Sequence, residues 1–131
     1  MQTFLQELCT KHGLSLDKHG DGWEILLPER TGLSCLLRIG PDALDWGTSV
    51  GQDTKELWSD WMDYLGYEER SEADLISDKQ RDISVCVERW MSANAVRIET
   101  VKRMWGFQKS KHAEWRHGDA WSEVIIYDPS R

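Results

Sequence analysis

The amino-acid sequence predicts one α+β domain over residues 1–131, with an antiparallel sheet of about five strands covered on one face by helices. A chain of 131 residues suits a single domain with its own core. Apolar residues alternate with polar ones in the first third of the chain and near its end, which is typical of half-buried strands. Between these parts they recur every three or four residues, as in helices. The expected order of elements is α-β-β-β-α-α-β-β.

An amphipathic helix is expected first, over residues 3–12. Its apolar side chains share one face, and Gly13 provides a natural end. The face consists of Phe4, Leu5, Leu8 and Cys9.

Three short strands should follow, over residues 22–28, 33–40 and 43–50. In each segment apolar residues occupy every second position, and Gly- or Pro-containing turns separate the segments. Consecutive strands joined by tight turns form an antiparallel meander.

The apolar period then changes to that of a helix over residues 54–65. Asp53 and Glu56 have the spacing of a capping box at its start. We expect the apolar stripe of this helix to lie in the core; it consists of Trp58, Trp61, Met62 and Leu65. A longer helix should begin after Ser71 and continue to about residue 93.

The last third of the chain predicts two strands joined by a polar segment. A strand over residues 95–107 should contain a bulge, because its inward phase shifts after Ile98. Residues 108–119 are polar and basic, which favours a long loop or an irregular hairpin. A final strand is expected over residues 120–128.

The charge of the chain favours a basic protein as its partner. The net charge is −7, and residues 42–78 alone hold eleven acidic residues against Lys55 and Arg70. Such a segment repels nucleic acid and anionic membranes and attracts basic surfaces. We therefore expect no nucleic-acid or membrane partner.

The cysteines and the N-terminus favour a cytoplasmic protein. Cys9, Cys35 and Cys86 are odd in number and widely spaced, as expected of reduced, buried thiols. The first residues carry Glu7 and lack the basic and apolar parts of a signal peptide. No apolar run approaches the roughly 20 residues that a membrane-spanning helix needs.

Two similar segments stand near opposite ends of the chain: KHGDGWEILLP from Lys18 and RHGDAWSEVIIYDP from Arg116. Gly and Asp before a strand are typical of turns, which is the interpretation we favour. In the alternative, His19 and His117 converge on a metal ion in a small enzyme or metal-dependent protein. No nucleotide-binding or catalytic motif is present, so we expect no enzymatic activity, catalytic residue, metal or cofactor.

The acidic, aromatic segment over residues 58–69 is the expected recognition surface. Aromatic residues are enriched at the centres of interfaces, and carboxylates speed association with a basic partner. Among the eight tryptophans, Trp46, Trp105 and Trp115 are those expected to be partly exposed. The expected partner-binding residues are Asp45, Asp60, Asp63, Tyr64, Tyr67, Glu68 and Glu69.

In size, charge and expected architecture the chain resembles the acidic α+β immunity proteins that neutralise bacterial toxins. The resemblance implies an inhibitor whose partner is a basic protein such as a toxin nuclease. Two alternatives belong to the same broad class. The early order α-β-β-β-α and the acidic balance are similar to small type III secretion chaperones, and a phage-encoded inhibitor of a host defence complex would share the same chemistry.

Overall fold

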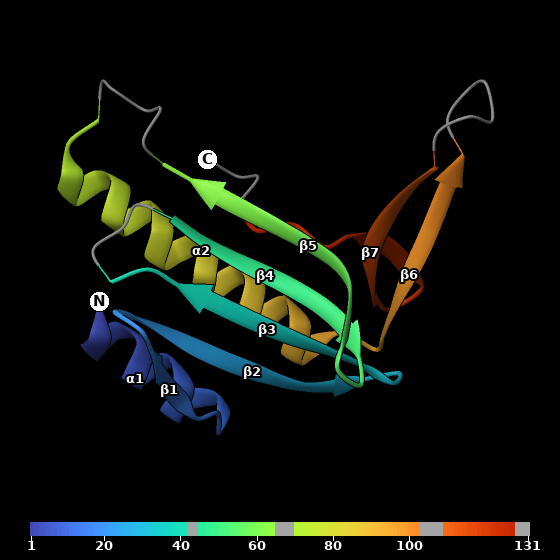
Figure 1. The fold of residues 1–131 in the computed structure, drawn as a ribbon, viewed down its shortest axis with the longest axis horizontal. Coiled ribbons are helices and arrows are strands. Elements are labelled where there is room, and N and C mark those ends of the chain that lie inside the picture. Colours follow the sequence, from blue (N-terminus) through green and yellow to red (C-terminus); the bar gives the residue numbers. More distant parts are fainter. Residues whose placement is uncertain (42–44, 65–69, 103–108, 128–131) are drawn as a thin grey trace.

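A computed structural model describes residues 1–41, 45–64, 70–102 and 109–127, and its architecture confirms the α+β prediction (Figure 1). One helix is followed by five strands, a second helix and three further strands. The elements are α1 (Gln2–His12), β1 (Leu16–His19), β2 (Gly22–Arg30), β3 (Leu33–Ile39), β4 (Asp45–Gln52), β5 (Lys55–Asp63), α2 (Glu72–Ser92), β6 (Ala95–Lys102), β7 (Lys109–His117) and β8 (Ala120–Glu123).

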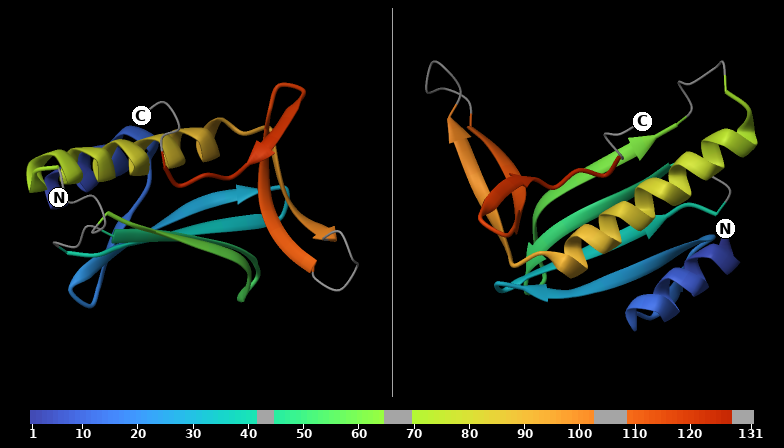
Figure 2. Two further views of the ribbon diagram at one scale, coloured as in Figure 1. Left: turned by 90° about the horizontal axis from the view of Figure 1, so that it is seen from above. Right: turned by 180° about the vertical axis from the view of Figure 1, so that it is seen from behind.

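The first five strands form an antiparallel meander in the order β1-β2-β3-β4-β5. Both helices pack on the same face of this sheet, as predicted, and leave the other face without a helix (Figure 2). Strands β6, β7 and β8 form a separate three-stranded sheet beyond the C-terminal end of α2. The predicted single sheet is therefore divided into two.

The core lies between α2 and the inner face of the meander. Alternate residues of β2 and β3 point inward, and α2 contributes Ile83, Val87 and Trp90. The Trp90 indole donates a hydrogen bond of 2.8 Å to the carbonyl oxygen of Pro28, which satisfies its polar atom inside the core. All three cysteines are free and buried, as predicted.

The hairpin between β2 and β3 fixes the second sheet to the first. Arg30 donates hydrogen bonds to the carbonyl oxygens of Trp90 and Met91 at the C-terminal end of α2. The helix dipole also favours a positive charge at this end. Thr31 accepts a hydrogen bond of 3.0 Å from the backbone amide of Val96 at the start of β6. These bonds hold the end of α2 and the start of β6 against the β2–β3 hairpin.

Residues 54–65 were predicted as a helix, and this prediction is wrong: Lys55–Asp63 is strand β5. The reversal before it is tight, because Gln52 pairs directly with Lys55 and Asp53 has a positive φ of 56°. Gly51 allows this, since a Cβ there would lie 2.4 Å from the Lys55 carbonyl oxygen. Pairing with β4 therefore outweighs the helical spacing of the apolar residues.

Three smaller predictions about strands are also wrong. Lys109–His117, predicted as loop or irregular hairpin, is the regular central strand β7 of the second sheet. Strand β6 pairs with β7 in continuous register from Ala95 to Lys102, without the expected bulge. Strand β1 was not predicted, and the last strand ends at Glu123, after which Val124 and Ile126 are buried outside a strand.

The two HGD segments are two-residue hairpin turns, as their composition predicted. His19 pairs with Gly22 across the first turn, and His117 pairs with Ala120 across the second. Gly20 and Gly118 adopt positive φ angles of 56° and 65°, which glycine accepts without strain.

Within the described ranges, no helix has the length and apolar character needed to cross a membrane.

Candidate functional site

The face of the meander that the helices leave uncovered presents two rows of side chains. We call it the open face. One row crosses all five strands, and its neighbour crosses four. The rows are Asp17, Glu24, Arg38, Gly47 and Trp61, and beside it Leu26, Leu36, Ser49 and Ser59.

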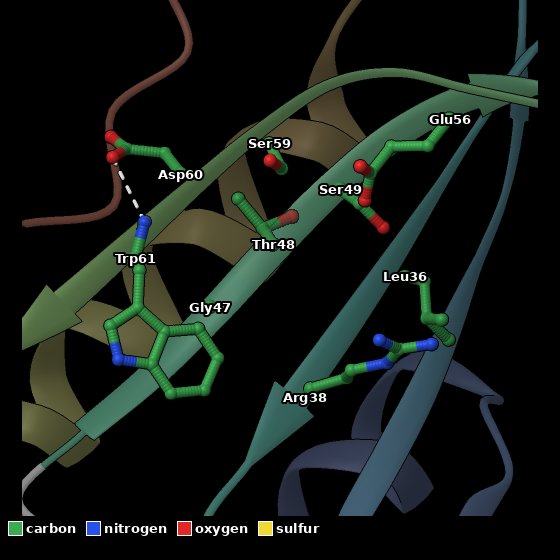
Figure 3. Close-up of a pocket in the computed structure, with 9 residues that line it drawn as sticks. All are labelled: Leu36, Arg38, Gly47, Thr48, Ser49, Glu56, Ser59, Asp60 and Trp61. Atoms are coloured by element: carbon green, nitrogen blue, oxygen red, sulfur yellow. Dashed lines mark hydrogen bonds between the residues drawn. The ribbon is translucent and has the colours of Figure 1, made fainter.

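Trp61 is the most prominent side chain of the open face. Its indole lies over Gly47 on the neighbouring strand (Figure 3), where an added Cβ would come within 2.0 Å of the ring atom Cε3. The side chain remains 53% exposed, so the prediction that Trp61 belongs to the core is wrong. Because Gly47 has no side chain, the Trp61 ring can pack directly against β4 while it remains exposed to solvent.

Leu26 and Leu36 extend the apolar part of this face. Leu26 is 58% exposed and pairs with the partly buried Leu36 across β2 and β3. Both residues occupy the outward phase of strands whose inward positions were correctly predicted, so the sequence carried this signal.

A shallow depression of about 380 Å³ lies beside Trp61 on the open face (Figure 3). Its lining combines an apolar side, small hydroxyl residues and both signs of charge. The lining includes Leu36, Arg38, Ser49, Glu56, Ser59 and Trp61.

Carboxylates surround this apolar centre. Asp45 and Asp63 lie directly opposite each other at one end of the β4–β5 pair, an arrangement that is unfavourable for like charges. One carboxylate oxygen of Asp45, Oδ1, is buried and has no hydrogen-bond partner among the described residues. A donor supplied by a bound protein would satisfy this oxygen of Asp45.

Arg38, the basic side chain in these two rows, already forms an ion pair within the chain. Arg38 Nε lies 3.2 Å from Glu24 Oε1, and His19 Nδ1 lies 3.4 Å from the same carboxylate oxygen. Glu24 is therefore largely neutralised, whereas Asp17, Asp45 and Glu56 leave the open face acidic.

The structure brings together three of the seven predicted partner-binding residues. Asp45 and Asp63 face each other, and Asp60 lies on β5 between Asp63 and the tight turn. Asp60 turns its carboxylate back to accept a hydrogen bond of 2.9 Å from the Trp61 amide. Tyr67, Glu68 and Glu69 lie outside the described residues.

Tyr64 was predicted at the surface, and this placement is wrong, because it is fully buried. Its hydroxyl accepts a hydrogen bond of 3.0 Å from the Trp46 indole and donates one to Asp82 of α2. Tyr64 thus anchors the end of β5 to the helix layer. Trp46 and Trp115 are also fully buried, against the prediction of partial exposure, and Trp105 lies outside the described residues.

His19 and His117 belong to different sheets and have unrelated neighbours. His19 contacts Glu24, whereas His117 donates through Nε2 to the Arg89 carbonyl oxygen at 2.8 Å. Across the four described ranges, no three His, Cys, Asp or Glu side chains are arranged to hold a metal ion.

One other cluster has the connectivity of a catalytic relay. Ser110 Oγ lies 3.2 Å from His112 Nε2, and His112 Nδ1 lies 3.3 Å from Glu123 Oε1. The Glu123 side chain is 62% exposed, so solvent screens its effect on the histidine. Catalysis of this kind also requires aligned oxyanion donors in a water-excluded site, and this exposed cluster supports no catalytic assignment.

Comparison with models of protein families, with curated proteins and with solved structures finds no match for this chain. The function is therefore inferred from the chemistry of the open face.

Proposed function

We propose that this chain is a small acidic binding protein of the inhibitor or immunity kind, which neutralises a basic protein partner through the open face. One observation carries the proposal. On the sheet face that the helices leave uncovered, the half-exposed Trp61 shares a depression with Leu36, the exposed Leu26 lies next to Leu36 on β2, and carboxylates surround this group.

The apolar centre suits a protein interface whose middle excludes water. Trp61 packs on Gly47 and offers a large aromatic surface. Its binding does not require the ordering of a long, flexible side chain, which would cost entropy. Aromatic residues in the middle of an interface supply much of its binding free energy. Leu26 and Leu36 enlarge this centre along the second row.

The surrounding charges suit a basic partner. Asp45, Glu56 and Asp63 lie around the apolar centre, and the chain as a whole carries a net charge of −7. Such an arrangement raises the rate of encounter with a basic protein and disfavours acidic ones. The buried Asp45 oxygen would gain a partner from a lysine or arginine of the bound protein.

In this proposal the protein acts in the cytoplasm, because its three cysteines are free, buried and without a disulfide framework. A secretion chaperone or a phage-encoded inhibitor would use the same surface chemistry. The identity of the captured partner separates these alternatives: a toxin, a secreted effector or a host defence protein.

The test compares affinity capture from a lysate of the native host by the wild-type chain and by the double variant Trp61→Ser, Leu26→Ser. The control variant carries Glu7→Gln and Asp119→Asn, which remove two exposed carboxylates from α1 and from the β7–β8 turn. We expect a basic protein that binds the wild type and the control, is released by salt, and is lost from the open-face variant. Equal capture by all three proteins, with melting temperatures showing that each is folded, would contradict the proposal.

The captured protein must then be purified and assayed with and without the chain. Inhibition of its activity at equimolar ratio supports the immunity function. Binding without inhibition supports the chaperone alternative.

A further inference from the structure

Strand β5 is an edge of the five-stranded sheet, and part of its backbone points away from β4. The Trp61 amide donates to the side chain of its neighbour Asp60 rather than to a β4 carbonyl. Because amides alternate in direction along an antiparallel strand, the amides of Ser59 and Trp61 both point to the free edge. Gly47 and Trp61 are then a non-hydrogen-bonded pair, which agrees with the close approach of the indole to Gly47.

The segment after β8 passes near this edge without pairing to it (Figure 2). Val124 donates its amide to the Ala113 carbonyl oxygen on β7 at 2.8 Å. Among the described residues, no backbone hydrogen bond joins residues 124–127 to β5. Within the described ranges, the outward amide and carbonyl of Ser59 thus have no backbone partner and can bond to another chain.

The edge also lies between two depressions. The first is the depression on the open face, which Ser59 and Trp61 line. The second, of about 330 Å³, lies between β5 and the second sheet and is lined by Trp58, His112 and Tyr127 among others. Side chains of a strand added beside β5 would alternate between the two faces of the sheet and so enter these two depressions in turn.

We propose that β5 binds an extended basic segment of the partner protein as an added strand along Ser59–Asp63. This inference rests on the proposed function and specifies its binding mode. Backbone hydrogen bonds supply affinity in such complexes, and pockets for alternate side chains supply specificity.

The charges along β5 select the occupant. Glu56 and Asp60 lie along the strand on opposite faces of the sheet, and unpaired edges commonly carry charges that prevent them from pairing with copies of themselves. A second copy of β5 would place these carboxylates opposite one another, which is unfavourable. A lysine or arginine of an added strand would instead form an ion pair with the carboxylate on the face to which it points.

The probe for this mode is an acetylated, amidated hexapeptide of alternating lysine and valine. Amide chemical shifts and hydrogen exchange of the isotope-labelled full chain are followed during its titration. We expect the largest shifts, and slower exchange, at the amides of Ser59 and Trp61. The same peptide with every amide N-methylated keeps its charge and side chains but has no backbone donor, and should bind at least about tenfold more weakly.

A variant of the protein tests the same backbone hydrogen bonding by removing a donor on β5 instead of on the peptide. Ser59→Pro removes an outward donor while leaving the pairing with β4, a position where an edge strand accepts proline. We expect it to weaken peptide binding about tenfold or more, since the amide donor is lost. Ser59→Ala removes the hydroxyl but keeps the amide, and should retain most of the affinity. If the proline variant unfolds at a lower temperature, the pair of peptides decides the result alone.

Three results would overturn the inference. The first is an absence of shifts at Ser59 and Trp61 with the unmodified peptide, and the second is equal binding of both peptides. The third is concentration-dependent protection of these amides without peptide, which would identify a second copy as the occupant. None of these affects the proposed function, which is tested separately by partner capture with the Trp61→Ser, Leu26→Ser variant.

Discussion

At the scale of single residues, the contact between Trp61 and Gly47 defines the open face. Gly47→Ala should lower the free energy of unfolding by about 1–3 kcal/mol, because its Cβ would meet the indole at 2.0 Å. Trp61→Ala should cost less than the roughly 3–5 kcal/mol typical of a buried tryptophan, since its side chain is 53% exposed. A double-mutant cycle by urea denaturation measures the coupling. Additive effects of the two substitutions would mean that the ring does not lie on Gly47.

Tyr64 is the residue whose role differs most from its prediction. Tyr64→Phe removes the hydroxyl that joins the Trp46 indole to Asp82, and all three side chains are buried. We expect the free energy of unfolding to fall by about 2–4 kcal/mol, because buried polar groups lose a hydrogen-bond partner. Tyr127→Phe is the control: this side chain is 48% exposed, and its loss of a hydroxyl should cost less than about 0.5 kcal/mol. Equal stability of the two variants would contradict the buried network.

The Cys35 thiol should be inert in the folded protein. Burial raises the pKa of Cys35 to about 12, against the opposing effect of its hydrogen bond with Thr48. At pH 8 only about one molecule in ten thousand then carries the reactive thiolate. Alkylation by iodoacetamide, followed by mass spectrometry, should be slow in native buffer and fast in denaturant. Rapid native labelling would show that Cys35 does not face the core.

The same raised pKa predicts how stability depends on alkaline pH. The folded state holds the Cys35 proton to about pH 12, whereas the unfolded thiol loses it near pH 8.5–9. The contribution to stability is therefore complete below about pH 8.5 and is lost progressively as the pH rises toward 12. Replacing Cys35 with alanine should flatten this part of the pH profile of unfolding.

At the scale of elements, the sequence predicted those segments in which a single period is present. Helix α2 shows one apolar face and a serine cap, and Ser71 indeed accepts a hydrogen bond from the Asp74 amide at 3.2 Å. Strands β2 to β4 were predicted for the same reason. Segment 54–65 carries both periods, since Trp58, Trp61 and Met62 fit a helix while Trp58, Met62 and Tyr64 fit a strand. Pairing with β4, a tertiary contact, decides between them.

Strand β7 was hidden for a different reason. Its inward positions include Ala113 and Trp115, both buried, but the other residues of the strand are polar or charged. A central strand of a small, half-exposed sheet needs few apolar residues. The sequence pattern therefore resembled a loop.

The turn before β5 provides a test of the strand assignment. Asp53 adopts a positive φ of 56°, which costs a residue with a Cβ more than it costs glycine. Asp53→Gly should therefore raise the free energy of unfolding by about 0.5–1 kcal/mol. If Asp53 were instead the cap of a helix, the substitution would lower stability slightly. A drop in the melting temperature would thus contradict the hairpin.

At the scale of the whole molecule, the predicted kind of partner rests on composition, whereas the candidate site depends on the fold. The concentration of carboxylates in residues 42–78 is a property of composition and does not depend on the fold. The exposure of Trp61 and Leu26 depends on which face the helices cover, which no local pattern reveals. Asp45, Asp60 and Asp63 do lie close to this face, although the predicted helix that led to two of them is a strand.

The measurement that tests the recognition surface most directly is the association rate of the chain with its purified basic partner as a function of salt. Wild type is compared with the triple variant Asp45→Asn, Glu56→Gln, Asp63→Asn. We expect the wild-type rate constant to fall about tenfold or more as salt is raised, and the variant to associate slowly at all salt concentrations. The melting temperature of each protein establishes that it is folded. A folded variant with wild-type rates and wild-type salt dependence would show that the partner binds elsewhere.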